Sequence, residues 1–199
     1  LALQAPALSA CSGIAIDDVG LDLKLGDQRF RQTGRVLITH RGLSGPATLR
    51  LSAFAARALH QNRYKGELKL DWSAGLGRSG LTERFQQWRQ EQARRTLAAA
   101  KPFDHLPRRL WQAFLTMAGV EPERRWADLP IKAERRLVEL LCAQLVPIQG
   151  RGPFGEEFVT AGGVALGEVN LATMESRRCP GLYLAGELLD VDGVTGGFN

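Results

Sequence analysis

The chain has 199 residues, of which 44% are hydrophobic and 24% are charged, and its formal net charge is +5 at pH 7. These values are typical of a globular protein of one or two domains, and they exclude an intrinsically disordered chain. No hydrophobic run approaches the roughly 20 residues that cross a bilayer, and the first residues lack the basic start of a secretory signal. We therefore expect a soluble, cytoplasmic protein with no membrane partner.

Three cysteines, Cys11, Cys142 and Cys179, are spread over the chain. Their number is odd and they form no C-x-x-C pair, which argues against a disulfide framework, a zinc cluster or a redox-active pair. We interpret them as reduced thiols in or near a core, and we predict no metal site.

The first 76 residues have the alternation of hydrophobic and polar residues that is typical of β-strands. Strands are expected over 14–25, 30–39 and 67–72, and a turn at 26–27 joins the first two. On one side of the first strand we expect Val19, Leu21, Leu23 and Leu25.

The stretch LITHRGLSGP at 37–46 predicts a strand, a tight turn and the start of a helix. Ser44 can cap that helix with its hydroxyl, and Pro46 suits its first turn. The free amides of the helix start, or His40, could hold an anion or donate a proton. A structural turn and cap with an incidental histidine explains the same residues, and both interpretations stay open at this point.

Residues 77–146 change to helical periodicity and hold the basic excess. Thirteen Lys and Arg stand against eight Asp and Glu in this segment, whereas the rest of the chain has thirteen of each. Hydrophobic stripes predict three helices: one after Ser79, one from about Pro107 to Gly119 and one over 131–145. We interpret the segment as a small helical subdomain whose tryptophans lie in its core.

Short strands are expected again at 146–149 and 157–160. A β-rich unit interrupted by a helical insertion is the simplest arrangement, so the predicted fold class is α+β. Gly162 and Gly163 follow directly, in VTAGGV. A double glycine allows the backbone to approach something flat or bulky, and it is equally suited to a turn.

The closing stretch, GLYLAGELLDVDGVTGGFN at 181–199, begins with a hydrophobic run at 182–185 that is typical of a strand buried on both faces. Glu187 follows at the carboxyl end of that strand, where open α/β sheets bind ligands, and its carboxylate can accept hydrogen bonds from sugar or ribityl hydroxyls. Asp190 and Asp192 can do the same, or can cap the turn that Gly193 closes.

The glycines near the end of this stretch, Gly196 and Gly197 after Thr195, allow main-chain amides to approach a ligand closely. A helix that begins there would direct its positive end at negative charge. A loop without a ligand fits the same spacing, and the residues alone favour neither interpretation.

Three stretches, in this order, resemble the bacterial flavoproteins called BaiN-like or YhiN-like, which are also labelled NAD(P)/FAD-dependent oxidoreductases or the aminoacetone oxidase family. The stretches are THRGLSGPA at 39–47, VTAGGV at 159–164 and TMESRRCPGLYLAGELLDVDGVTGGFN at 173–199. The resemblance covers essentially the whole chain. It implies an FAD-dependent oxidoreductase that reduces a small-molecule substrate, enone-like or cyclic, with NAD(P)H as electron donor.

The resemblance also implies a Rossmann-type FAD-binding domain into which a β-barrel-like domain and a small helical domain are inserted. Residues 1–76 would form the first part of the β-barrel-like domain, 77–146 the helical insert, 147–160 the return of the barrel and 161–199 a partial FAD-binding segment. We expect the dinucleotide fingerprint G-x-G-x-x-G to be absent, and we expect this chain to lack the helix that the family has after Gly197. We therefore expect a fragment that neither holds FAD tightly nor turns over without the N-terminal FAD-binding domain of its parent chain.

Particular residues receive roles from the same resemblance. The backbone at Gly162 and Gly163 would approach the flavin, and Glu187 would bind its ribityl or pyrophosphate region. Asp192 and the loop after it would line the flavin, with the last amides stabilising charge on the reduced ring. That loop comprises Gly193, Val194, Thr195, Gly196 and Gly197.

On the other side of the site, His40 and Ser44 would face the substrate, and no catalytic acid or base is assigned.

The basic helical segment supports a rival interpretation, a module that binds nucleic acid or an acidic protein. Against it, the arginines flank hydrophobic stripes as solvated faces do, and an excess of five charges is modest. We therefore do not expect a nucleic-acid partner. A third interpretation is that the insertion covers the active site as a lid or forms a subunit interface.

Overall fold

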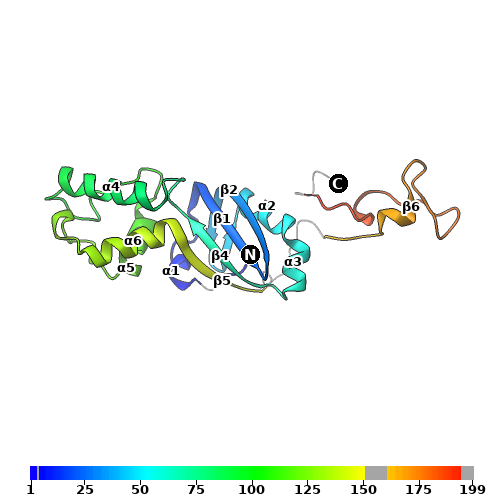
Figure 1. The fold of residues 1–199 in the computed structure, drawn as a ribbon, viewed down its shortest axis with the longest axis horizontal. Helices are drawn as coiled ribbons and strands as arrows, with labels where there is room; N and C mark the ends of the chain where they lie inside the picture. The colour runs from blue at the N-terminus through cyan, green and yellow to red at the C-terminus, as the bar shows by residue number, and fades with distance from the viewer. Residues whose placement is uncertain (4, 151–160, 194–199) are drawn as a thin grey trace.

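The computed structural model describes residues 1–3, 5–150 and 161–193 of the chain. Figure 1 shows an elongated molecule with a helical part at one end, a curled sheet in the middle and the return segment, residues 161–193, at the other end. This mixed architecture agrees with the predicted α+β class, and the described residues contain no Rossmann-type parallel sheet. The strand predicted at 157–160 lies outside the described residues.

The sheet has the strand order β3-β2-β1-β4-β5, and each neighbouring pair is antiparallel. Val19, Leu21, Leu23 and Leu25 are all buried, which confirms that these side chains lie on one side of the first strand. The strands are β1 (Ala15–Leu25), β2 (Gln28–Thr39), β3 (Gly42–Ser44), β4 (Lys65–Asp71) and β5 (Gln144–Gln149).

Two short helices, α2 (Pro46–Phe54) and α3 (Ala56–Gln61), follow β3, and α2 packs on β1 and β2. Pro46 occupies the first turn of α2, as predicted. The prediction that Ser44 caps this helix is wrong, because Ser44 is held in β3 opposite Leu37 and the capping position falls on Gly45. Gly45 has a φ of +96°, and a Cβ there would lie 2.9 Å from the Leu37 nitrogen, so this turn requires glycine.

The helical part consists of α4 (Gly77–Glu91), α5 (Arg108–Met117) and α6 (Ile131–Ala143), in agreement with the three hydrophobic stripes. Two boundaries differ from the prediction. The first helix begins at Gly77 rather than after Ser79, and the third ends two residues earlier than expected because Gln144 pairs with Leu70 and begins β5. Leu145, the last residue of the range predicted to be helical, is 57% exposed on that strand.

Aromatic side chains form the core of the helical part. The rings of Trp111 and Trp126 stack with their centroids 6.3 Å apart, and Phe85 packs 5.6 Å from Trp126. Both of these indole N–H groups donate to backbone carbonyls, so their polar atoms are satisfied inside the core. The prediction that the tryptophans of residues 77–146 are core residues is confirmed for these two, whereas Trp88 is only partly buried.

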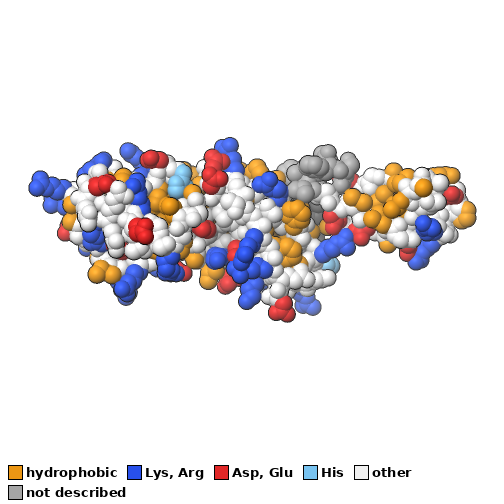
Figure 2. Space-filling model, turned by 45° about the horizontal axis from the view of Figure 1, so that its top comes forward, with side chains coloured by type: hydrophobic (Ala, Val, Ile, Leu, Met, Phe, Trp, Pro, Cys, Tyr) orange, Lys and Arg blue, Asp and Glu red, His pale blue; other side chains and the backbone are white. Residues whose placement is uncertain are grey.

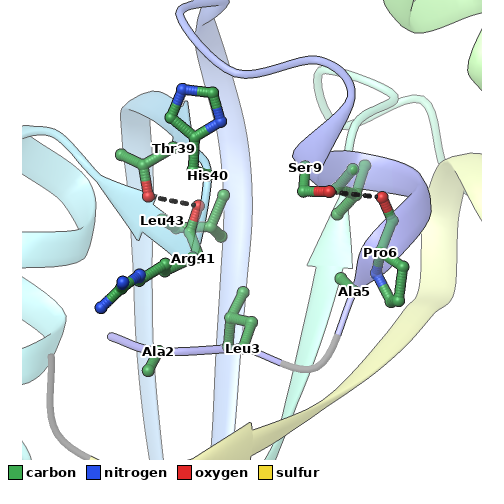
Figure 3. A pocket seen from close by; sticks show the side chains of 11 residues that line it. Ala2, Leu3, Ala5, Pro6, Ser9, Thr39, His40, Arg41 and Leu43 are labelled. Atoms are coloured by element: carbon green, nitrogen blue, oxygen red, sulfur yellow. Dashed lines mark hydrogen bonds between the residues drawn. The ribbon is translucent and has the colours of Figure 1, made fainter. Parts of the chain in front are cut away.

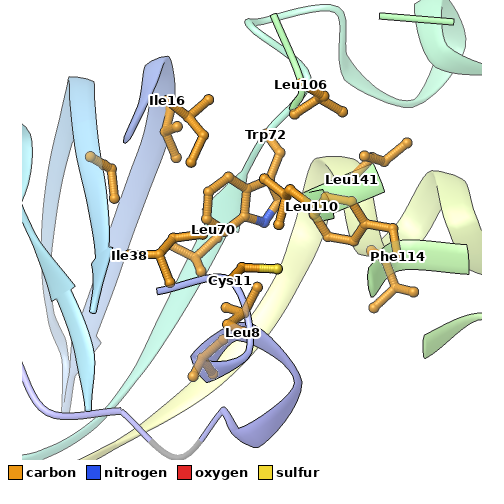
Figure 4. Close-up of a cluster of buried hydrophobic side chains, with 14 of the residues drawn as sticks. Leu8, Cys11, Ile16, Ile38, Leu70, Trp72, Leu106, Leu110, Phe114 and Leu141 are labelled. Atoms are coloured by element: carbon orange, nitrogen blue, oxygen red, sulfur yellow. The ribbon is translucent and has the colours of Figure 1, made fainter. Parts of the chain in front are cut away.

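Trp72 joins the sheet and the helical part in one continuous core. It follows β4 directly, and Figure 4 shows its ring between sheet residues such as Ile38 and helical residues such as Phe114. Its centroid lies 6.0 Å from that of Phe114, and its indole N–H donates to the Gln144 side-chain oxygen at 2.8 Å. Helix α1 (Pro6–Ser9) adds Leu8 to the same core.

The return segment contains short elements only: 3₁₀ helices η2 (Leu166–Glu168) and η3 (Gly186–Leu188), and strands β6 (Val169–Asn170) and β7 (Glu175–Ser176). The prediction of a strand buried on both faces at 182–185 is wrong for the described structure. Tyr183 makes a single bridge to Glu175 and is 63% exposed, because no neighbouring sheet among the described residues covers it. Cys179 is exposed here, whereas Cys11 is buried, so a place in or near a core is wrong for Cys179.

Among the described residues, none of the helices combines the length and the hydrophobicity that a membrane-crossing segment requires.

Candidate functional site

Two stretches of the return segment lie side by side and bring predicted site residues together. The amide of Val164 donates to the Leu188 carbonyl at 2.8 Å, and the amide of Asp190 donates to the Val164 carbonyl at 2.9 Å. In addition, the amide of Gly162 donates to the Asp192 side-chain carboxylate at 2.9 Å. We call residues 162–164 and 187–193 the return loop pair.

Gly163 is required by the closeness of these two stretches. A Cβ at this position would lie 2.5 Å from both the carbonyl carbon and the oxygen of Leu189, closer than real Cβ contacts occur. Its neighbour Gly162 has a φ of +99°, which favours glycine as well. The double glycine therefore allows two backbone stretches of the same chain to approach each other. The sequence alone is compatible with a turn or with an approach to a flat or bulky group.

Arg57, on α3, is a site residue that the sequence analysis missed. Its guanidinium forms an ion pair with Asp190, and its Nε and Nη2 atoms each lie 3.2 Å from an Asp192 oxygen. The Gly162 amide, and after it the Arg57 guanidinium, hold the pKa of the Asp192 carboxyl below its usual range. No local signal could identify this arginine, because its partners lie more than 130 residues further along the chain.

The other predicted flavin-side residues are arranged less closely. Glu187 lies in η3 with an exposed side chain, and Gly193 follows Asp192 at the end of the described part of the chain. Val194, Thr195, Gly196 and Gly197 lie outside the described residues. The structure therefore joins Gly162, Gly163 and Asp192 in one cluster and leaves Glu187 beside it.

His40 lines a pocket at a different place on the molecule. The pocket has a volume of about 440 Å³ and is formed by the N-terminal stretch and the turn between β2 and β3 (Figure 3). Its two hydroxyl groups already donate to backbone carbonyls: Thr39 to Gly42 at 3.1 Å and Ser9 to Pro6 at 2.7 Å. The lining residues are Ala2, Leu3, Ala5, Pro6, Leu8, Ser9, Thr39, His40, Arg41, Gly42 and Leu43.

Ser44, the second residue predicted on the substrate side, does not line this pocket. The lining also contains no described residue of the return segment, so the structure does not bring His40 to the return loop pair. The lining combines hydrophobic side chains with the exposed imidazole of His40 and the guanidinium of Arg41, which suits a small group with both apolar and polar parts.

One stretch of the chain, Gly75 to Gly80, has the spacing G-x-G-x-x-G, so the expected absence of this spacing is wrong. It connects β4 to α4, but β4 pairs with β5 antiparallel, whereas the dinucleotide fingerprint belongs to a parallel βαβ unit. The Gly77 amide donates to the Ser73 hydroxyl at 3.2 Å, and that hydroxyl donates to the Asp71 carboxylate at 2.5 Å. A carboxylate at the helix start repels phosphate, so the chemistry is not that of a dinucleotide site.

The cations of α6 are not neutralised within their own helix. Its two acidic residues form ion pairs with arginines of α4: Glu134 with Arg89 at 2.6 Å, and Glu139 with Arg78. Three exposed cations remain, at helical positions i, i+3 and i+4, without an ion pair in the part of the chain that the structure describes. They are Lys132, Arg135 and Arg136, which we call the α6 cationic face. Figure 2 shows Lys and Arg side chains protruding at this helical end of the molecule.

Residues 1–159 match the family model described as HI0933-like protein barrel and H2TH domain. The chain is 34% identical over 170 residues to a ribosomal RNA dihydrouridine synthase of Escherichia coli, covering 85% of this chain and 39% of that protein. It is 29% identical over 169 residues to a 3-dehydro-bile acid delta(4,6)-reductase of Clostridium scindens, covering 84% of this chain and 40% of that protein.

A second ribosomal RNA dihydrouridine synthase, from Haemophilus influenzae, is 29% identical over 192 residues, which cover 96% of this chain and 44% of that protein. The chain thus spans about two fifths of the length of these curated relatives. None of the three names contains aminoacetone oxidase, so that label stays a prediction. Because the family model spans most of the chain, the protein belongs to the HI0933-like family, the flavoproteins that its three motif stretches resemble.

Proposed function

We propose that this chain supplies the substrate-side domains and one wall of the flavin site of an FAD-dependent oxidoreductase. The observation that carries the proposal is the return loop pair, in which Gly162, Gly163 and Asp192 form one cluster in a chain whose first 159 residues match the HI0933-like family. The whole protein's activity, donor and substrate are part of the proposal, with NAD(P)H as the donor.

The return segment offers groups that would suit one side of a flavin. Glu187 is an exposed acceptor for ribityl hydroxyls, and the neighbouring Leu188 and Val191 offer exposed hydrophobic surface to a ring. The Gly75 to Gly80 stretch does not suit the pyrophosphate of FAD, because the Asp71 carboxylate places a negative charge beside it. This chain would therefore hold the ring and ribityl side, and the N-terminal FAD-binding domain of the parent chain would hold the phosphates.

FAD, when bound, supplies a hydride equivalent, and the residues of this chain position and electrostatically tune the ring. The names of the relatives suggest two substrates with one chemistry. A dihydrouridine synthase saturates the carbon–carbon double bond of a uracil ring, and a delta(4,6)-reductase saturates a double bond of a steroid. In both, two electrons and two protons are added to a double bond conjugated to a carbonyl group. A conjugated double bond of this kind supports the enone-like or cyclic substrate that the family resemblance implies.

We propose uridine in ribosomal RNA as the first substrate candidate. The α6 cationic face supports it, because Lys132, Arg135 and Arg136 are exposed and have no ion pair within the described part of the chain, while the acidic residues of α6 are paired with α4. Cations of this kind bind the phosphates of RNA. Nucleic acid, which the sequence analysis did not expect, is here the substrate of the oxidoreductase rather than the ligand of a separate module. A small steroid-like substrate is the second candidate, supported by the name of the Clostridium scindens relative.

The flavin part of the proposal is tested by absorbance between about 350 and 500 nm, where bound flavin absorbs. The chain as given and the same chain extended at both ends, with the N-terminal FAD-binding domain and the final helix, are purified side by side. Flavin bands in the extended chain alone are the expected result. A well-folded extended chain without flavin would contradict the proposal.

The substrate part is tested by fluorescence anisotropy with a labelled ribosomal RNA hairpin at several salt concentrations. Changing Lys132, Arg135 and Arg136 together to Gln removes three phosphate partners, so the slope of log affinity against log salt falls by about 2. The matched control changes three exposed cations of the sheet region, Lys24, Arg63 and Lys65, to Gln. Equal loss in both variants, or no binding by the unchanged chain at low salt, would favour the steroid-like substrate.

A further inference from the structure

Arg57 connects the sheet region to the return segment. Its guanidinium joins residues 1–150 to 161–193 through hydrogen bonds and ion pairs with Asp190 and Asp192. The return segment otherwise extends away from the sheet (Figure 1) and has exposed hydrophobic side chains such as Tyr183 and Leu188. Arg57 is therefore a polar link that can fix the position of the return segment relative to the sheet.

The contact reaches beyond the two carboxylates that Arg57 touches. Asp192 binds Arg57 through Oδ2 and accepts the Gly162 amide through Oδ1. Asp190 binds Arg57 through its side chain, while its amide donates to the Val164 carbonyl. One guanidinium thus fixes both carboxylates, and each carboxylate residue is bonded to the opposite stretch of the return loop pair.

An exposed pair of one cation and one anion contributes little to stability, because water competes for both groups. Here a planar guanidinium is shared by two carboxylates that lie two residues apart, which fixes direction as well as distance. A lysine can neutralise one of these carboxylates but lacks the planar fork that reaches both.

We propose that Arg57 is a positioning residue for the flavin site: it holds the return loop pair in place through Asp190 and Asp192 and compensates their negative charge beside the ring. This inference rests on the proposed function, in which the return loop pair is a wall of the flavin site. Arg57 itself touches neither flavin nor substrate in this assignment. It acts through the two aspartates.

The first experiment is amide hydrogen exchange, measured by NMR on the 199-residue chain without flavin. In Arg57→Gln the amides of Gly162 and Val164 are expected to exchange about fivefold faster, because local opening of the return loop pair becomes easier. The control is Arg29→Gln, which removes an equally exposed arginine from its carboxylate partner Asp22 on the sheet. Unchanged exchange at Gly162 in Arg57→Gln overturns the proposal.

The second experiment uses the extended chain with flavin. Arg57→Gln is expected to weaken flavin binding and to lower the reduction potential, since two uncompensated carboxylates disfavour the negative charge of reduced flavin. Arg57→Lys is expected to restore most of the potential and part of the affinity. If amide exchange is faster in Arg57→Gln while flavin affinity and reduction potential are unchanged, Arg57 is only a structural contact. This result would overturn its positioning role.

The two proposals can fail separately. If the unchanged extended chain binds no flavin, the proposed function fails, whereas the exchange measurement still decides whether Arg57 holds the return loop pair.

Discussion

The Gly162 amide donates a hydrogen bond to the Asp192 carboxylate at 2.9 Å, across 30 residues of chain. This bond closes the return loop pair at the end where Arg57 reaches it from α3. It brings two residues that the family resemblance assigned to the flavin site into direct contact, and it makes the geometry of the return loop pair dependent on the ionisation of a carboxyl group.

The first prediction concerns pH. The Gly162 amide and the Arg57 guanidinium bind the ionised form of Asp192 and hold its pKa below the usual range. Ionised Asp192 therefore contributes its full share to folding stability above its unfolded-state pKa of about 4. This contribution is lost as the pH falls through the lower folded-state pKa. We expect the Gly162 amide resonance to change in this acidic window, as followed by NMR titration.

Asp192→Asn is expected to abolish this response, and Asp22→Asn is the control. The pKa of Asp22 is also lowered, first by the hydrogen bond from Arg29, but Asp22 lies on the sheet. A Gly162 titration that disappears in Asp22→Asn and persists in Asp192→Asn would contradict the assignment.

The second prediction concerns Gly163. In Gly163→Ala the new methyl group would lie 2.5 Å from the Leu189 carbonyl, so the return loop pair must separate. We expect the protection of the Val164 and Asp190 amides to be lost, with a local cost of about 1–3 kcal/mol, while the sheet stays folded. Gly167→Ala is the matched control, since a Cβ there meets nothing within 4 Å. Equal protection in both variants would show that the two stretches do not approach as described.

The third prediction concerns Trp72, whose indole N–H donates to the buried Gln144 oxygen. Trp72→Phe keeps a ring in the core and leaves that oxygen unpaired, which costs about 1–3 kcal/mol in the free energy of unfolding. Urea unfolding measures this cost. Adding Gln144→Leu removes the unpaired group, and we expect part of the loss to be recovered. If the double variant loses more free energy of unfolding than the two single variants lose together, this account is wrong.

The fourth prediction concerns the three thiols. Cys179 is exposed, whereas burial raises the pKa of the Cys11 and Cys142 thiols and lowers the fraction of reactive thiolate. Titration of the native protein with a coloured disulfide reagent at pH 8 is expected to give one fast equivalent and two slow ones. Cys179→Ser removes the fast phase, and denaturant makes the remaining thiols react together. A fast phase that survives this substitution would contradict the burial of the other two.

Periodicity was informative where one face of an element is buried. Val19, Leu21, Leu23 and Leu25 alternate in sequence and are all buried in β1, and the helix predicted after Pro107 forms as α5. These elements could be predicted because the hydrophobic core dictates which positions are apolar, whatever lies elsewhere in the chain.

Contacts between distant residues could not be predicted in this way. No sequence pattern links Arg57 to Asp190. The spacing around Ser44 predicts a helix cap, because rules based on neighbouring residues take no account of its strand pairing with Leu37. A run such as 182–185 is typical of a buried strand, but burial needs a neighbouring sheet that the described residues do not supply. At Gly75 to Gly80 the G-x-G-x-x-G pattern is present, but the parallel strands that would make it a dinucleotide site are not found there, since β4 and β5 are antiparallel.

The pairing of Leu70 with Gln144 places the two ends of the helical part next to each other on adjacent strands of the sheet. A segment whose ends adjoin can be exchanged for another, longer or shorter, without altering the path of the remaining strands, provided that the new segment covers Trp72. The sheet can therefore act as a constant frame that carries interchangeable modules. One frame could then present a cationic module to a polyanion in one protein and an apolar module to a lipid-like molecule in another.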